Sequence, residues 1–335
     1  MLIAVTLLCA CGERGAETRA DSAAAPDRDA AIAMPDTQSA TIAANILAAG
    51  GNAVDAAVAA GFALAVSEPE AGNIGGGGFM LIHMNGEPYF VDYRETAPLA
   101  ADRDMYLDID GNVIPGASRV GHLAVGVPGA VAGLWEAHRK FGKLPWRDVV
   151  MPSAELARNG FEVHEYLARS LTRGVEKFSG KTNFGNYFSA MQAGEMLIQP
   201  ELADTLERIA NDGPDGFYAG KTADLIVAEM QRGKGLITHE DLSSYKAIWR
   251  KPLEADWRGY TVLAAPPPSS GGFAVLQLLR IKDLLADEFE GIEHNSPQYI
   301  HLIAEIEKRV FADRAEYLGD PDFYDVPMAE LLSDG

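Results

Sequence analysis

Arg94 is the residue of this sequence whose type and place best suit the binding of a ligand. It stands in "VDYRETAP", two positions after Asp92, at the end of a strand-like run. A guanidinium in such a place can hold a carboxylate through two parallel hydrogen bonds, because its donors form a rigid fork. The competing interpretation is a salt bridge with Glu95, Asp92 or another acid, and position alone favours that salt bridge.

Four consecutive glycines, Gly75 to Gly78, raise the question of a phosphate loop. Such loops lie between a strand and the N-terminus of a helix and commonly continue with Lys-Ser/Thr, so that amides and the helix dipole face the anion. Here the glycines precede the strand-like run "FMLIHM", and no lysine follows them. We therefore expect a close approach of two backbone segments at the start of a buried strand, and no bound phosphate.

The chain by itself presents no complete set of catalytic groups. Ser269 and Ser270 in "PPPSSGG" lack a GxSxG motif, and we expect them to cap the helix that follows. The seven histidines show no HExxH or comparable metal-binding spacing. We therefore expect neither a serine nucleophile nor a metal site.

Two short acidic motifs are better explained as turns than as metal or acid–base sites. "DIDGNVIPG", which contains Asp108 and Asp110, lacks the remaining ligands of a calcium loop. "GDPDF", which contains Asp320 and Asp322, follows a long helical pattern, and we expect it to end that helix.

Composition excludes several classes of function. The chain has 335 residues, 47% of them hydrophobic, and a formal net charge of −20 at pH 7. A phosphate backbone would be repelled, so nucleic acid is not an expected partner. Both cysteines, Cys9 and Cys11, lie in the first dozen residues, which leaves no thiol chemistry for the rest of the chain.

The N-terminal residues suggest export. "MLIAVTLLCAC" has an apolar stretch too short to span a bilayer but suited to a signal peptide. Leu8 to Cys11 resembles a bacterial lipobox, with Cys11 as the lipidated residue, although a basic segment before it is missing and a plain hydrophobic N-terminus is the alternative. The polar, alanine-rich residues that follow predict a flexible tether. We therefore expect a signal-like segment and tether over 1–33 and one folded unit over 34–335.

Hydrophobic patterns predict a layered body of helices and sheet. We expect helices over 38–67 with a break near Gly50, and a hairpin of two strands around Asn85-Gly86. Because "FMLIHM" is apolar on both faces, its sheet should be covered on both sides. Further helices are predicted at 128–142, 145–160, near 164–171, at 201–211 and 221–232, within 266–285 and at 296–318, and Thr238 with Asp241 predicts the cap of another.

Taken together, several motifs resemble the gamma-glutamyltransferase (glutathione hydrolase) family. They occur in the family's order and cover about residues 34–328: "AGGNAVDAAVAAGFALAVSEPEAGNIGGGGFMLI", "YRETAP", "GVPGAVAGLWEAHRKFGKLPWRDVVMPSAELARNGF", "ITHEDLSSY", "PPPSSGG" and "ADRAEYLGDPDF". The resemblance implies an α/β fold, a four-layer αββα sandwich of the N-terminal-nucleophile hydrolase type. In this family one precursor cuts itself into a large and a small subunit. This chain resembles most of the large subunit, so the nucleophilic threonine, first residue of the small subunit, is expected beyond Gly335.

The resemblance reverses the expectation for Arg94. As the arginine of "RETAP", it is expected to bind the α-carboxylate of the substrate. Implied substrates are glutathione and related gamma-glutamyl amides, with amino acids or peptides as acceptors, the small subunit as partner and no cofactor or metal. The alternatives are a related acylase that removes the glutaryl group of a cephalosporin precursor, and a non-catalytic lipoprotein that binds gamma-glutamyl compounds. The expected location is the periplasm or the outer surface of a bacterial membrane, with lipid at Cys11.

Overall fold

The computed structural model describes residues 30–333. The expected lipid attachment at Cys11 lies outside these residues. The compact unit to which the following elements belong is Met34–Gly335. Among the described residues, no helix combines the length and the apolar character needed to cross a membrane.

Two helices in succession begin the main hydrophobic core. α1 spans Thr37–Ala48 and α2 spans Ala53–Ser67. Asn52 caps α2 in a capping box with Asp55, as its sequence predicts. α2 is apolar nearly all round and is buried along most of its length, because its many alanines allow neighbouring helices to pack closely.

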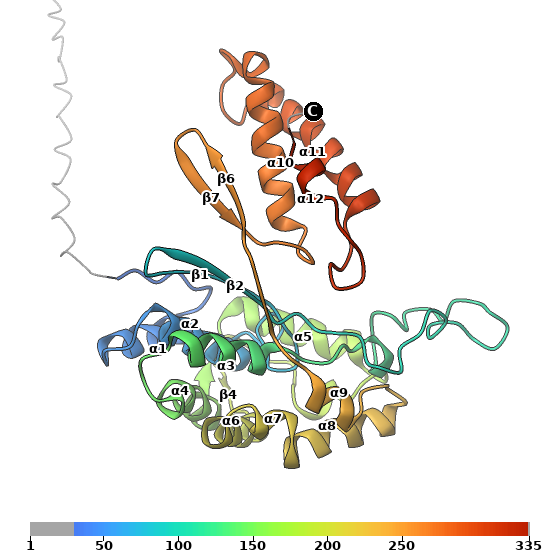
Figure 1. Cartoon of the computed structure of the whole chain (residues 1–335). Coiled ribbons are helices and arrows are strands. Elements are labelled where there is room, and N and C mark those ends of the chain that lie inside the picture. Colours follow the sequence, from blue (N-terminus) through green and yellow to red (C-terminus); the bar gives the residue numbers. More distant parts are fainter. Residues whose placement is uncertain (1–29, 334–335) are drawn as a thin grey trace, which may run out of the picture. The chain divides into compact units, whose positions relative to one another are not determined.

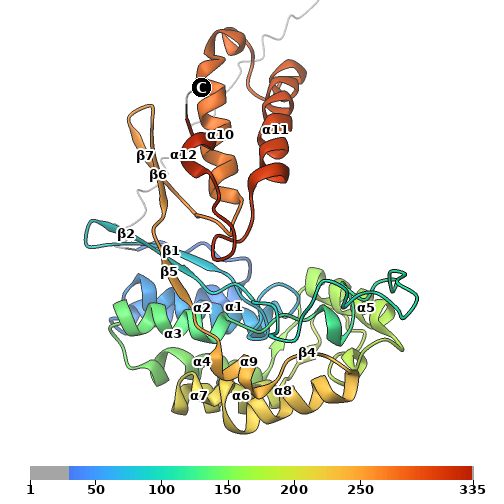
Figure 2. The same cartoon turned by 45° about the vertical axis from the view of Figure 1, so that its right-hand side comes forward.

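Further helices pack with α1 and α2 on one side of a small sheet (Figures 1 and 2). They are α3 (Ala130–Phe141), α4 (Trp146–Asn159), α5 (Glu165–Phe178), α6 (Pro200–Asp212), α7 (Asp215–Tyr218), α8 (Gly220–Gly233) and α9 (His239–Ser244). Two short strands, β3 (Phe161–Glu162) and β4 (Met196–Leu197), pair with each other among them. The predicted helices are confirmed, whereas the single-turn α7 was not predicted.

The sheet next to these helices is antiparallel, with strand order β1-β2-β5. β1 spans Phe79–Met84, β2 spans Glu87–Asp92 and β5 spans Ile248–Arg250. The predicted hairpin is confirmed, since the two turn residues between β1 and β2 have φ angles of 55° and 83°. The register sets Asp92 opposite Ile248.

The two faces of β1 are covered to different extents within the described residues. Ile82 and Val91 point into the main core and are 6% and 0% exposed. On the opposite face Phe90 is buried, but Leu81 is 44% exposed. The prediction that both faces of this strand are covered is therefore wrong for this part of the chain, because no described element packs over Leu81 closely enough to bury it.

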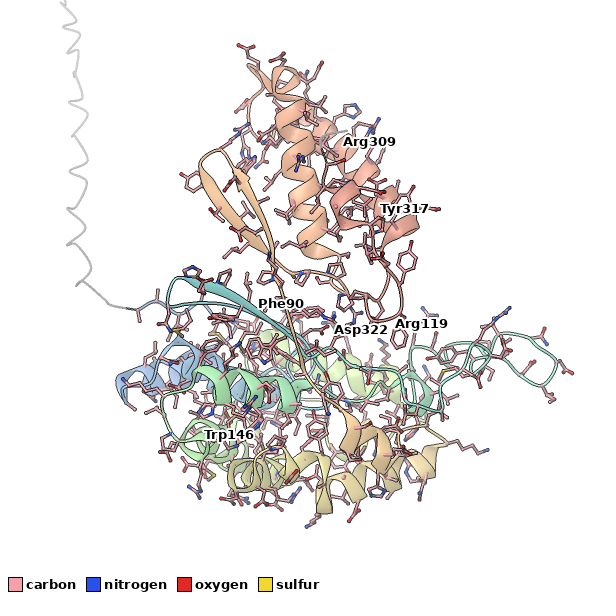
Figure 3. All side chains as sticks on the ribbon, viewed as in Figure 1. Phe90, Arg119, Trp146, Arg309, Tyr317 and Asp322 are labelled. Atoms are coloured by element: carbon pink, nitrogen blue, oxygen red, sulfur yellow. The ribbon has the colours of Figure 1, made fainter. Side chains whose placement is uncertain are left out.

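The C-terminal part of the chain forms a second, smaller core. Strands β6 (Leu253–Trp257) and β7 (Tyr260–Ala264) make a hairpin, and α10 (Gly271–Leu284) and α11 (Pro297–Tyr317) pack against each other. A short α12 (Met328–Leu331) and three 3₁₀ turns (His122–Ala124, Phe184–Asn186, Ala286–Phe289) complete the described elements. Figure 3 labels Asp322, which lies on the turn after α11.

Candidate functional site

The four glycines bring two backbone segments into contact beside the end of β2. Gly78 and Tyr93 exchange two main-chain hydrogen bonds of 3.2 and 3.0 Å. A Cβ atom on Gly77 would lie 2.4 Å from the carbonyl oxygen of Tyr93, so only glycine fits there. The carbonyl of Gly76 accepts a hydrogen bond of 2.8 Å from the amide of Gly129 at the start of α3. The predicted close backbone approach is confirmed, and these contacts fix the segment that carries Arg94.

Two side chains fix the main chain of Arg94 itself. Its amide donates a hydrogen bond of 3.0 Å to Oδ1 of Asp92. Its carbonyl oxygen accepts a hydrogen bond of 2.8 Å from the hydroxyl of Tyr245. Two residues later, Thr96 forms an isolated bridge with Val127. The peptide groups on both sides of the Arg94 Cα atom are therefore held before any ligand binds.

A cluster of tyrosines supports this arrangement. The Tyr245 ring stacks on Tyr218 at a centroid distance of 5.9 Å, and the Tyr218 hydroxyl donates to the carbonyl of Pro128. The Tyr93 ring fills a notch on α3 that Gly133 leaves open. Burial raises the pKa of Tyr218 and Tyr245 well above the usual range, and it raises the pKa of Tyr93 to about 12. The hydroxyls therefore stay protonated and able to donate at neutral pH.

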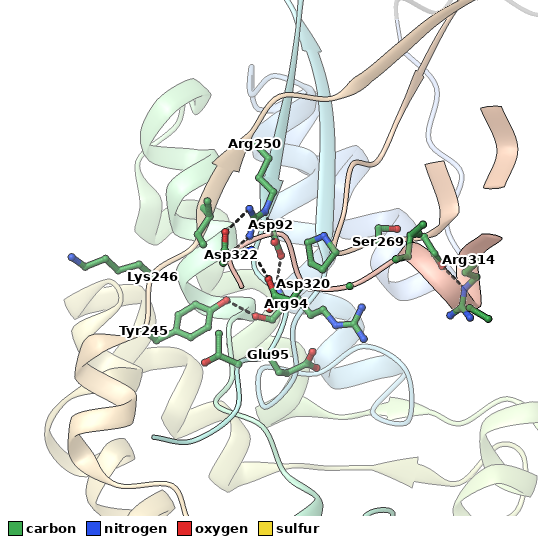
Figure 4. Close-up of a pocket in the computed structure, with 17 residues that line it drawn as sticks. Asp92, Arg94, Glu95, Tyr245, Lys246, Arg250, Ser269, Arg314, Asp320 and Asp322 are labelled. Carbon is green, nitrogen blue, oxygen red and sulfur yellow. Dashed lines mark hydrogen bonds and ion pairs between the residues drawn. The ribbon is translucent and has the colours of Figure 1, made fainter. Parts of the chain in front are cut away.

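A cavity of about 620 Å³ opens beside Arg94. Its lining comes from the end of β2, from the segment leading into β5, from the turn before α10 and from the end of α11 (Figure 4). Pockets that bind small molecules commonly measure about 300–1,000 Å³. The cavity is thus large enough for a small peptide, and charged groups dominate its lining.

The guanidinium of Arg94 is free to bind a ligand. The residue is exposed and lines this cavity, and Figure 4 draws no contact to its guanidinium. Within residues 30–333 its side chain forms no ion pair, and neither does that of the neighbouring Glu95. The salt bridge with Glu95 or Asp92 that position alone favoured is therefore absent from the described part of the chain.

Arg250 takes the acidic partners that Arg94 does not have. Its Nε donates to Oδ2 of Asp92 at 2.8 Å, and its Nη1 and Nη2 reach the two oxygens of Asp322 at 2.9 and 2.7 Å. Hydrogen bonds and attraction within this group raise the pKa of Arg250 and lower that of Asp322. Arg250 and Asp322 are therefore both ionised at neutral pH.

The remaining candidates make local structural contacts. Ser270 is the N-cap residue of α10 but makes no capping bond with its hydroxyl, which instead accepts from Nε of Arg314 at 2.9 Å. Ser269, one residue earlier, accepts from the amide of Gly271 at 3.2 Å. The prediction that these serines cap α10 is thus wrong, because Ser269 lies before the cap position and Arg314 of α11 takes the hydroxyl of Ser270.

Both acidic motifs form turns, as predicted. Asp108 accepts hydrogen bonds from the amides of Asp110 and Asn112. Asp320 accepts one from the amide of Asp322 just after α11 ends. Among the described residues, no group of three or more His, Cys, Asp or Glu side chains is placed to hold a metal ion.

Comparison with known proteins identifies the family. A model of the gamma-glutamyltranspeptidase family matches residues 39–335. The chain belongs to this family. It is 61% identical over 301 residues to the glutathione hydrolase proenzyme of Pseudomonas aeruginosa. This alignment covers 90% of the chain and 54% of the proenzyme. For the corresponding proenzyme of Escherichia coli the identity is 47% over 308 residues, covering 90% and 53%. The chain spans about half the length of the curated relatives it matches.

Solved structures confirm the predicted fold class. The gamma-glutamyltranspeptidase from Pseudomonas nitroreducens complexed with L-DON superposes with a TM-score of 0.89 at 56% identity and covers 91% of each chain. The cephalosporin acylase from Bacillus halodurans gives a TM-score of 0.77 at 29% identity, with 88% of this chain and 56% of that one covered. The fold is therefore that of the N-terminal-nucleophile hydrolases.

Sequence patterns alone did not identify Tyr245 and Arg250. Tyr245 lies 151 residues from Arg94, and Arg250 lies 158 residues from Asp92. No spacing rule links positions so far apart, because their contact depends on how β5 pairs with β2. The signals that could have suggested them are an aromatic residue shortly before a short strand and an arginine at the end of that strand.

Proposed function

We propose that this chain is the large-subunit part of a gamma-glutamyl hydrolase/transferase acting on glutathione and related gamma-glutamyl amides. Support comes from the family and from its curated relatives, which are glutathione hydrolase proenzymes. The observation that carries the proposal is the state of Arg94. Its main chain is held by Asp92 and Tyr245, while its guanidinium lines a cavity without an ion pair among the described residues.

In this proposal Arg94 binds the α-carboxylate of the gamma-glutamyl group. A guanidinium can form two charge-assisted hydrogen bonds with a carboxylate, and a main chain that is already ordered lowers the entropy lost on binding. The distant end of the substrate is then fixed, so its amide carbonyl reaches a defined place. The proposed nucleophile is a threonine beyond Gly335, whose own amine acts as base. Water, an amino acid or a peptide would resolve the acyl-enzyme.

The test is Arg94→Lys in the complete gene product. Lysine keeps the charge but loses the fork, and charge-assisted contacts of this kind contribute about 1.5–3 kcal/mol. We expect KM for gamma-glutamyl-p-nitroanilide to rise about ten- to a hundredfold with a smaller change in kcat, because the contact exists before and during the reaction. Arg119→Lys, an exposed arginine outside the cavity, is the matched control and should leave KM unchanged. An unaltered KM in Arg94→Lys would refute the role.

A glutaryl acylase is the second candidate, because a cephalosporin acylase is among the structural neighbours. A glutaryl amide carries a carboxylate at the same distance from the amide as a gamma-glutamyl amide, but it lacks the α-ammonium group. Arg94 could serve both substrates. The kcat/KM ratio for gamma-glutamyl- and glutaryl-p-nitroanilide separates them: a preference of about tenfold or more for the ammonium-bearing substrate supports the hydrolase, and the reverse preference supports the acylase.

We propose further that the small subunit from the same precursor is the partner of this chain. The term proenzyme in the names of the relatives supports this proposal. Mass spectrometry of the native product tests it. A longer precursor or a cleaved two-chain product supports the enzyme, whereas an intact product of 335 residues supports a non-catalytic binding protein.

The cellular location is likewise proposed to be the periplasm or the outer membrane surface, with lipid on Cys11. The support is the lipobox-like "LCAC" in the sequence. Metabolic labelling with a clickable fatty acid should mark the parent protein and not Cys11→Ser. Equal labelling of the two, or labelling of neither, would contradict the lipid anchor.

A further inference from the structure

Four acidic side chains, those of Asp92, Glu95, Asp320 and Asp322, line the same cavity as the guanidinium that is proposed to bind a carboxylate. Two of them, Asp92 and Asp322, form ion pairs with a second arginine, Arg250. Either carboxylate would compete with a substrate carboxylate for the guanidinium if it were free to turn, because an internal partner is always present at high effective concentration. A substrate site at Arg94 is therefore favoured when Asp92 and Asp322 are engaged elsewhere, because fewer internal carboxylates then compete for the guanidinium.

Arg250 engages both of them. Its side chain is 15% exposed and Asp92 is 6% exposed, so this part of the group is shielded from water. All of the contacts are direct: 2.8 Å to Asp92, and a bidentate pair at 2.9 and 2.7 Å to Asp322 (Figure 4). Three donors of the guanidinium are thus used, and a bidentate geometry resists rotation of the acid. Asp322 is the more exposed acid, at 43%, and so the one that could turn most easily.

The second oxygen of Asp92 is also occupied. Oδ1 accepts the hydrogen bond from the amide of Arg94, while Oδ2 accepts from Arg250. Arg250 therefore affects the substrate site in two ways. It orients the carboxylate that holds the backbone of Arg94, and it occupies acids that would otherwise neutralise the Arg94 guanidinium.

We propose that Arg250 is a positioning residue that keeps Arg94 available for the substrate carboxylate by occupying Asp92 and Asp322. This inference rests on the proposed function, since it assigns Arg94 to substrate binding. Arg250 does not touch the substrate. Replacing it releases Asp322, which then pairs with Arg94 and must be displaced each time a substrate binds.

The decisive experiment uses two variants of the complete gene product, assayed with gamma-glutamyl-p-nitroanilide. Arg250→Gln should raise KM about tenfold with kcat changed less than about threefold, because an internal carboxylate then competes for Arg94. Adding Asp322→Asn to this variant should bring KM back to within about threefold of the parent value, since the competitor is now neutral. A purely structural role predicts the opposite, because a second lost contact cannot repair the first.

A third variant keeps the inference testable if Arg250→Gln fails to fold or to mature. Asp322→Asn alone removes a negative charge near the anionic end of the substrate, so we expect KM to fall about two- to fivefold. The matched control is Arg258→Gln. Like Arg250→Gln it breaks an arginine–aspartate ion pair, here the exposed pair with Asp283, but it does so outside this cavity. It should leave KM as it is.

The outcomes separate this inference from the proposed function. An unchanged KM in Arg250→Gln, a double variant no better than Arg250→Gln, or a KM at or above the parent value in Asp322→Asn would each overturn the role of Arg250. If Arg94→Lys raises KM while the Arg250 or Asp322 variants give any of these contrary results, the proposed function stands and only the role of Arg250 fails. If Arg94→Lys has no effect on KM, the carboxylate site itself is wrong.

Discussion

Replacing Gly133 with alanine tests whether close packing behind Arg94 holds the site together. Gly133 lies near the start of α3, where it faces the ring of Tyr93. A Cβ atom at this position would lie 2.0 Å from Cγ and 2.3 Å from Cβ of that tyrosine. Carbon atoms in contact are normally about 3.5–4.0 Å apart, so the ring would have to move by about 1.5 Å or more.

Two opposing effects decide the stability of this variant. Alanine is favoured over glycine inside a helix by about 1 kcal/mol. Overpacking in a dense core costs about 1–3 kcal/mol and sometimes more. Because the atoms that clash belong to the base of the Tyr93 side chain and its ring, which packs against the main core, we expect the upper part of that range to apply. The net change should be a loss of about 1–2 kcal/mol, which lowers Tm by several degrees in a protein of this size.

Thermal unfolding of the variant, with Gly61→Ala as control, provides the measurement. Gly61 is also inside a helix, but its new Cβ would meet only the tip of Leu134 at 3.1 Å, where a flexible side chain can yield. We expect Gly61→Ala to match the parent Tm and Gly133→Ala to fall below it. KM for a gamma-glutamyl substrate should rise in Gly133→Ala, because Tyr93 adjoins Arg94. A Gly133→Ala protein as stable as Gly61→Ala would refute the argument that this notch is needed.

Two further predictions concern the tyrosine hydroxyl and an acid on the surface. Tyr245→Phe removes the hydroxyl that donates to the Arg94 carbonyl. The lost hydrogen bond contributes about 0.5–1.5 kcal/mol, so we expect KM for a gamma-glutamyl substrate to rise by at most about tenfold. A lower kcat at constant KM would contradict this prediction. Hydrogen bonds from Arg232 and His122 lower the pKa of Glu229 from 4.5 to about 2. Its contribution to stability is therefore present above pH 4.5 and lost as the pH falls towards 2. Glu229→Gln should flatten the fall of Tm over this range, and a fall as steep as that of the parent would exclude the interaction.

Local signals in the sequence were sufficient for most helices and for the hairpin. Asn52 with Asp55 and Thr238 with Asp241 form capping boxes because each pair needs only residues within one turn of helix. Asn85 adopts the positive φ that a two-residue hairpin requires. The coverage of β1 was not predictable in the same way. Whether an apolar residue such as Leu81 is buried depends on every element that packs over it, and the chain spans about half the length of its curated relatives.

The free state of Arg94 could not be predicted locally, because it depends on the register between two strands far apart in sequence. Asp92 lies opposite Ile248, which makes Arg250 its diagonal neighbour on the same face of the sheet. A slip of one residue would turn Arg250 to the other face. Asp92 would then have no cation but Arg94 within its own segment, and the salt bridge favoured by position alone would form. The pairing of three β5 residues with β2 thus decides whether Arg94 forms an ion pair with Asp92 or stays available to bind a carboxylate ligand.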